Sequence, residues 1–89
     1  MKLILFYGDG CIECKKMEPI VKRLEKELKV KFVRKEIWHH PLNAKLMVSY
    51  GCKTLPMFLN QENGEFVCGP TTYNKLKAWL LKQTRLRKP

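Results

Sequence analysis

Two cysteines, Cys11 and Cys14, stand with two residues between them, directly after the glycine-bearing segment 8–10. Sulfurs at this spacing can close a small ring, so the pair could exchange a disulfide with another thiol. Apolar residues follow at helical spacing, which predicts that the pair opens a helix (Met17, Ile20, Val21, Leu24 and Leu28). Unpaired N–H groups and the helix dipole favour a thiolate there, and the thiolate is the nucleophile. The pattern predicts thiol–disulfide chemistry.

The rest of the chain predicts strands and helices that would position this pair. Residues 3–7 are continuously apolar, as in a strand that is covered on both faces. Strand 31–37 is rich in lysine, which suits the edge of a sheet. The predicted order is strand 3–7, helix 12–28 with Pro19 inside it, strand 31–37, a helix from Pro41 that Gly51 ends, strand 57–59, an Asn63–Gly64 turn, strand 65–68, and a helix capped by Thr71 or Thr72.

This order, β-α-β-α-β-β-α, predicts an α/β fold with a small mixed sheet. A strand, a crossover helix and a second strand form a right-handed parallel unit. The final hairpin adds antiparallel strands, which makes a four-stranded sheet with helices on both faces. With 89 residues, we expect one domain over residues 1–84 and a basic tail over residues 85–89.

Composition narrows the class of protein. No apolar run approaches the roughly 18 residues that a membrane span needs, so we expect no membrane association. Four cysteines in a short chain can staple a secreted domain. However, no signal peptide is recognisable, and 45% hydrophobic residues suffice for a core. We therefore expect a cytoplasmic protein whose cysteines are catalytic.

The chain is strongly basic, with 18 Lys and Arg against 8 Asp and Glu and a formal net charge of +10. The basic residues are spread along the helices and both termini, which favours a surface that steers toward acidic protein partners over one that binds nucleic acid. An alternative stays open. The chain could be a basic binding module, for nucleic acid or an acidic protein, whose cysteine pair is redox-inactive or holds a metal with help from His39 and His40.

Several of these motifs together resemble one family. They are Cys11-x-x-Cys14, Pro19 five residues later, the loop Tyr50–Pro56 that ends in Thr-Leu-Pro, the turn Asn63-Gly64-Glu65, and Gly69 before the last helix. In this combination and order, over nearly the whole chain, they resemble the thioredoxin-like superfamily in its short, glutaredoxin-sized form.

The resemblance implies roles for particular residues. Cys11 would be the exposed attacking thiolate and Cys14 the more buried resolving thiol. Pro56 would follow a cis peptide bond, and Thr54, Leu55 and Pro56 would form the groove for an extended substrate. No metal or organic cofactor is implied. The partners would be disulfide-containing proteins and an electron donor.

The identity of that electron donor stays open, because the chain departs from both branches of the superfamily. Thioredoxins carry a tryptophan before the first cysteine, where this chain has Gly10. Glutaredoxins carry an acidic residue near the last helix that helps hold glutathione, and segment 68–72 contains none. Both a thioredoxin-reductase-like and a glutathione-based donor remain possible.

Five other positions carry expectations of their own. Cys52, four residues before Pro56, is either a small, partly buried apolar residue or a third thiol open to mixed disulfides. Cys68 lies inside an apolar strand and is expected in the core. Trp38 is expected either in the core or at an interface. The two histidines that follow it are expected in a solvated turn, where one of them caps the next helix.

We predict that reduced Cys11 has a thiol pKa below the ~8.5 of a free cysteine, and that the pair forms a reducing couple. The helix terminus stabilises the thiolate, while the charges of Glu13 and of Lys15 and Lys16 should nearly cancel each other. Titration of the thiolate's ultraviolet absorbance measures this pKa. A value at or above that of free cysteine would refute the prediction.

Overall fold

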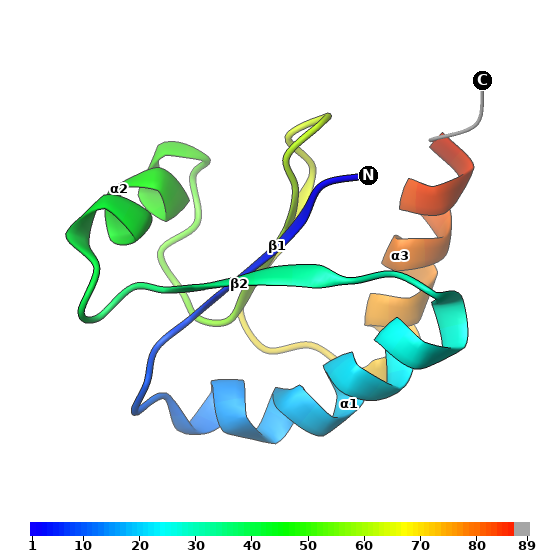
Figure 1. Ribbon diagram of the computed structural model, residues 1–89, viewed down its shortest axis with the longest axis horizontal. Helices are drawn as coiled ribbons and strands as arrows, with labels where there is room; N and C mark the ends of the chain where they lie inside the picture. Colours follow the sequence, from blue (N-terminus) through cyan, green and yellow to red (C-terminus); the bar gives the residue numbers. More distant parts are fainter. Residues whose placement is uncertain (87–89) are drawn as a thin grey trace.

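A four-stranded sheet with a helix after three of its strands forms the fold in the computed structural model, which describes residues 1–86 (Figure 1). The predicted α/β class and element order are confirmed. The elements are β1 (Leu3–Tyr7), α1 (Ile12–Leu28), β2 (Phe32–Glu36), α2 (Pro41–Ser49), β3 (Met57–Asn60), β4 (Phe66–Cys68) and α3 (Tyr73–Leu86). No helix of this part of the chain is long and apolar enough to cross a membrane.

The strand order is β2-β1-β3-β4, so β2 lies at an edge, as its lysines predict. Strand β1 pairs parallel with β2 and antiparallel with β3, and β4 pairs antiparallel with β3. The parallel register sets Tyr7 beside Glu36. The carboxyl ends of β1 and β2 therefore lie at the same end of the sheet, and the loop that carries the cysteines lies next to the loop that follows β2.

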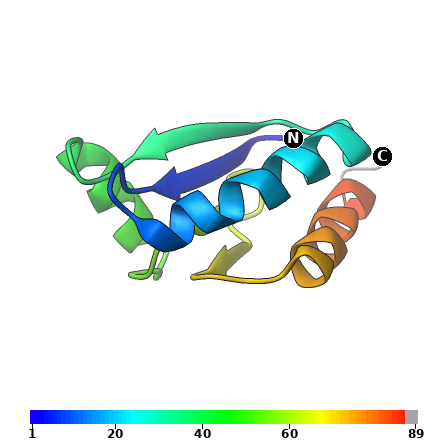
Figure 2. The same cartoon turned by 90° about the horizontal axis from the view of Figure 1, so that it is seen from below.

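Each face of the sheet carries its own apolar cluster, because side chains alternate along a strand. Leu3 and Leu5 belong to the cluster under α1 and α3, and Ile4 and Phe6 to the cluster under α2. Figure 2 shows α1 and α3 together on one side of the strands, with α2 at the end far from α3. Of the apolar positions predicted on helix 12–28, three are buried in the first cluster (Met17, Val21 and Leu24), and Ile20 and Leu28 are partly buried against it. Leu76 and Leu80 of α3 are buried in the same cluster. The predicted helices on both faces are confirmed.

The helix ends follow the predicted signals. Pro41 occupies the first turn of α2, and Gly51 follows that helix with a φ of 104°. Thr72 Oγ1 accepts the Lys75 N–H at 3.2 Å and caps α3. Helix α3 includes Arg85, the first residue of the predicted basic tail, and residues 87–89 of that tail lie outside the described part of the chain.

Gln83, completely buried on α3, ties this helix to the hairpin between β3 and β4. Its Oε1 accepts hydrogen bonds from Asn60 Nδ2 and Asn63 Nδ2, each at 2.9 Å. Its Nε2 donates to Glu65 Oε1 at 3.0 Å. The turn itself is the one that Asn63–Gly64 predicts: Gly64 has a φ of 78°, a backbone conformation that glycine adopts without steric cost.

We predict that Gln83→Ala lowers the free energy of unfolding by about 1–3 kcal/mol, because the buried amide of Asn60 loses its acceptor. Urea unfolding followed by circular dichroism measures the change. Lys75→Ala, at an exposed position of the same helix, is the control and should stay within about 0.5 kcal/mol of the native chain. Equal losses in the two variants would contradict the role of this network.

Candidate active site

The Cys11–Cys14 pair lies at the start of α1 as a disulfide, with 5.2 Å between the two Cα atoms. Cys11 is the N-cap, and its Sγ accepts the Cys14 N–H at 3.1 Å. The Cys11 N–H donates to Gly8 O at 3.0 Å, which closes the turn that leads from β1 into the helix. Cys11 is half-buried, whereas Cys14 is only 7% exposed. A sulfur of another protein therefore has easier access to Cys11.

The side chains around the pair are charged or apolar and largely exposed. Glu13 and Lys16 form an ion pair with 3.7 Å between Oε2 and Nζ. Their opposite charges offset each other near the sulfurs, and an exposed pair of this kind contributes little to stability. Ile12, between the two cysteines, is exposed and adds apolar surface at the mouth of the site. That the N–H groups and dipole of α1 are the main electrostatic influence on Cys11 stays a prediction.

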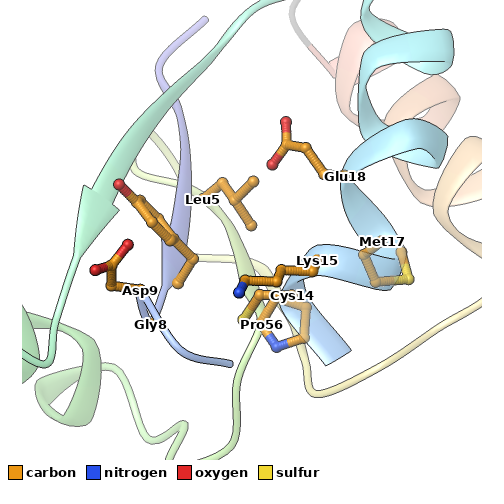
Figure 3. Close-up of a pocket in the computed structure, with 9 residues that line it drawn as sticks. Leu5, Gly8, Asp9, Cys14, Lys15, Met17, Glu18 and Pro56 are labelled. Atoms are coloured by element: carbon orange, nitrogen blue, oxygen red, sulfur yellow. The ribbon is translucent and has the colours of Figure 1, made fainter. Parts of the chain in front are cut away.

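A pocket of about 190 Å³ lies behind the pair, between β1 and α1 (Figure 3). Lys15 extends from α1 across this pocket toward Gly8. Glu18 also lines the pocket, but its carboxylate is paired with the Arg34 guanidinium of β2. The lining residues are Leu5, Tyr7, Gly8, Asp9, Cys14, Lys15, Met17, Glu18 and Pro56. Cys14 and Pro56 therefore adjoin the same space.

The loop before β3 supplies the predicted substrate residues. The Leu55–Pro56 peptide bond is cis, as expected, and Pro56 is buried. Of the three predicted residues, Pro56 lines the pocket beside Cys14. Thr54 is exposed, and Leu55 is half-buried against the apolar cluster under α2. The role of these three residues in binding stays a prediction.

Trp38 packs against the segment that leads into the cysteines. A Cβ atom at Gly8 would stand 2.6 Å from Trp38 Cε2, and one at Gly10 would stand 2.7 Å from Trp38 Cζ3. Cβ atoms do not approach other atoms this closely, so the indole ring occupies the space that side chains at these positions would need. Trp38 is nevertheless 56% exposed. It therefore presents an aromatic surface next to Cys11.

Glu36, at the end of β2, joins the loop before the cysteines to the loop after β2. Its Oε2 accepts the Asp9 N–H at 2.9 Å and the Trp38 N–H at 3.1 Å. Its Oε1 accepts the His39 N–H at 2.8 Å and lies 3.2 Å from His40 Nδ1. Burial alone would raise the pKa of this carboxyl, but these hydrogen bonds outweigh it and lower the pKa to about 2. Glu36 is therefore ionised at neutral pH and holds both loops.

Comparison with known families agrees with this geometry. The family model described as Thioredoxin matches residues 1–82. The chain belongs to the thioredoxin family. No curated protein matches the chain.

This chain differs from other thioredoxins in the aromatic residue that lies near the first cysteine. Thioredoxins carry a tryptophan directly before that cysteine, whereas here that residue is Gly10, and Trp38 of the loop after β2 packs against it. The sequence left Trp38 undecided between core and interface. The structure places it at the surface, against Gly8 and Gly10.

Glu36 was not predicted from the sequence as part of the site. A usable signal exists: β1 and β2 are parallel, so a carboxylate at the end of β2 lies next to the loop that follows β1. The two histidines lie in an exposed turn, as expected, but His40 does not cap α2 with its side chain. Both histidine rings lie instead against Glu36. Within residues 1–86, no group of three or more His, Cys, Asp or Glu side chains is placed to hold a metal ion.

The expectation for Cys68 was wrong. This residue is exposed at the end of β4 and forms a second disulfide with Cys52, with 5.6 Å between the two Cα atoms. Cys52 is fully buried in the apolar cluster under α2. The pairing was not predicted, because the cis-proline loop and β4 come together only through the antiparallel β3–β4 hairpin.

We predict that Glu36→Gln flattens the acid dependence of stability. The folded pKa of Glu36 lies below its ordinary value of 4.5, so its stabilising contribution is complete above about pH 5 and fades as the pH falls toward 2. The amide removes this titration and turns an N–H donor toward backbone N–H groups. Urea midpoints between pH 7 and pH 3 should therefore fall less in the variant than in the native chain, from a lower starting value.

Glu62→Gln is the matched control, since its carboxylate is exposed and 3.7 Å from the terminal amine. It should retain most of the native fall in midpoint with acid. If Glu36→Gln and the native chain lost stability in parallel, the structural role given to Glu36 would be wrong.

Proposed function

We propose that this chain is a thiol–disulfide oxidoreductase that acts on protein disulfides through Cys11 and Cys14. One observation carries the proposal: an accessible sulfur at the N-terminus of α1 is paired with a buried sulfur that adjoins Pro56. Membership in the thioredoxin family supports it. The two sulfurs differ in access, which suits an attacking and a resolving role.

The proposed reaction transfers two electrons. The Cys11 thiolate attacks one sulfur of a substrate disulfide, that S–S bond breaks, and the second substrate sulfur leaves as a thiolate. Cys14 then attacks Cys11 Sγ, which releases the first substrate sulfur and forms the Cys11–Cys14 disulfide. The substrate ends as a dithiol, and an electron donor must return the pair to its reduced state. The N–H of Cys14, 3.1 Å from Cys11 Sγ, would stabilise the attacking thiolate of Cys11.

The substrate would lie as an extended segment along Thr54, Leu55 and Pro56. Thr54 is exposed and Leu55 is half-buried, so the backbone of this loop reaches the surface next to the pocket at Cys14. Ile12 and Trp38 add apolar surface beside Cys11. A substrate segment with an apolar residue next to its cysteine would fit this apolar surface.

The partners that we propose are disulfide-containing proteins with acidic surfaces, because the net charge of +10 accelerates encounter with negative partners. The electron donor would be a thioredoxin-reductase-like enzyme or a glutathione-based system. A cytoplasmic location is part of this proposal, and it places the pair where cellular thiols can reduce it.

We predict that in the Cys11→Ser variant the disulfides of insulin are reduced only at the uncatalysed rate, because the attacking sulfur is missing. Cys14→Ser should retain the first step and accumulate a mixed disulfide at Cys11, because the resolving sulfur is missing. Turbidity of reduced insulin measures the first effect, and mass spectrometry of the trapped species measures the second. Thermal unfolding of both variants controls for the fold.

Equal activity of native chain and Cys11→Ser would overturn the proposal. The other candidate, a basic module for nucleic acid, rests on the net charge alone. It would be favoured by salt-dependent retardation of RNA that persists when both cysteines are replaced by serine.

A further inference from the structure

The Cys52–Cys68 disulfide joins two sulfurs with unequal access to solvent. Cys52 has 0% exposure and packs in the apolar cluster under α2. Cys68 is exposed as the last residue of β4. A thiol in solution can therefore approach this disulfide from the Cys68 side, while the Cys52 side is closed by the core.

This disulfide lies against the loop that we propose binds substrate. Thr54 O lies 3.2 Å from Cys52 Sγ and 3.9 Å from Cys68 Sγ, so both sulfurs adjoin one carbonyl of the loop. The Gly69 N–H donates to Pro56 O at 2.9 Å. The disulfide and this hydrogen bond attach the two ends of loop 52–56 to the end of β4.

Gly69, the residue after Cys68, also lies close to this loop. It has a φ of 88°, and a Cβ atom at this position would stand 3.4 Å from Thr54 Cγ2. The segment that carries Cys68 is therefore in direct contact with Thr54. A change at the Cys68 sulfur is in a position to alter the placement of Thr54, Leu55 and Pro56.

We propose that Cys52–Cys68 is a second exchangeable disulfide, that a small monothiol of the glutathione class attacks it at Cys68, and that its opening weakens substrate binding at loop 52–56. The attack on Cys68 does not depend on the function proposed above. The consequence for substrate binding rests on that function.

The exchange balances with the monothiol as reductant. Its thiolate attacks Cys68 Sγ, the Cys52–Cys68 bond breaks, and Cys52 Sγ leaves with the electron pair and takes up a proton. Cys68 then carries the monothiol as a mixed disulfide. A second monothiol can attack this adduct, releasing the oxidised dimer and leaving Cys68 as a thiol. The new Cys52 S–H has an acceptor in place, because Thr54 O is 3.2 Å away.

Opening the disulfide removes one of the two attachments of the loop and leaves the other. The Gly69–Pro56 hydrogen bond remains, and Cys52 remains a small apolar residue in its cluster. We therefore expect the chain to stay folded while loop 52–56 samples more conformations. A more flexible loop binds an extended substrate less tightly, because more conformational entropy is lost on binding.

The first experiment isolates the second pair in the full chain by replacing Cys11 and Cys14 with serine. The variant is equilibrated with glutathione buffers of increasing reduced fraction, alkylated, and analysed by mass spectrometry. The expected result is a glutathione adduct on Cys68, alkylation of Cys52 after unfolding, and full reversal on reoxidation. An adduct on Cys52, or a pair that opens only in denaturant, would overturn the proposal.

The second experiment measures the effect on substrate. Cys52→Ala combined with Cys68→Ser should raise KM for insulin about fivefold or more, the lower end of usual coupling between two sites, with an unchanged rate of Cys11 alkylation. Val67→Ala, on the same strand but against the other face, keeps the disulfide and should keep the native KM. An unchanged KM in the double variant would disprove the link to the substrate loop.

The two experiments separate the inference from the proposed function. If the native chain showed no Cys11-dependent reduction of insulin, the proposed function and the effect on KM would both fail. The glutathione titration would still establish or refute Cys68 as the site of attack, because the variant used there has no Cys11–Cys14 pair. The titration also keeps the inference testable if the Cys52→Ala, Cys68→Ser variant fails to fold.

Discussion

The parallel pairing of β1 with β2 places two loops side by side, and the Glu36 carboxylate holds them there. One loop leads into the cysteines, and the other carries Trp38. Because the carboxylate accepts N–H groups from both loops, its negative charge is stabilised and its pKa stays near 2. The start of α1, and with it Cys11, takes its position from this contact. The aromatic surface beside Cys11 has the same origin.

Both disulfides of the described chain combine one accessible and one buried cysteine. At the first, the helix N-terminus adds electrostatic stabilisation for a thiolate on the accessible side. At the second, Cys68 is exposed on a strand end, and its partner Cys52 lies in the apolar core. Pro56 lies between the two pairs, because it lines the pocket at Cys14 and is hydrogen-bonded to the residue after Cys68. The geometry thus connects the two disulfides through the loop proposed to bind substrate.

Elements with a strong local signal could be predicted closely. The helix at 12–28 and the strand at 3–7 have the predicted bounds, because apolar periodicity and flanking glycines are properties of adjacent residues. The order and type of all elements followed from the same signals. The prediction for Cys68 was wrong, and no prediction was made for Glu36. The disulfide partner of Cys68 lies 16 residues away, and the Asp9 N–H that Glu36 accepts lies 27 residues away, so no short-range pattern encodes either contact.

The sequence by itself determined the fold class, the helix that opens at Cys11 and the presence of a dithiol, because each depends on local spacing and residue type. Tertiary structure alone decided which surfaces face one another. It placed the Trp38 ring over Gly8 and Gly10, and it brought Cys68 within bonding distance of Cys52. The physical reason is that strand register and loop packing are collective: they arise from many weak contacts across the sheet, and no single segment specifies them.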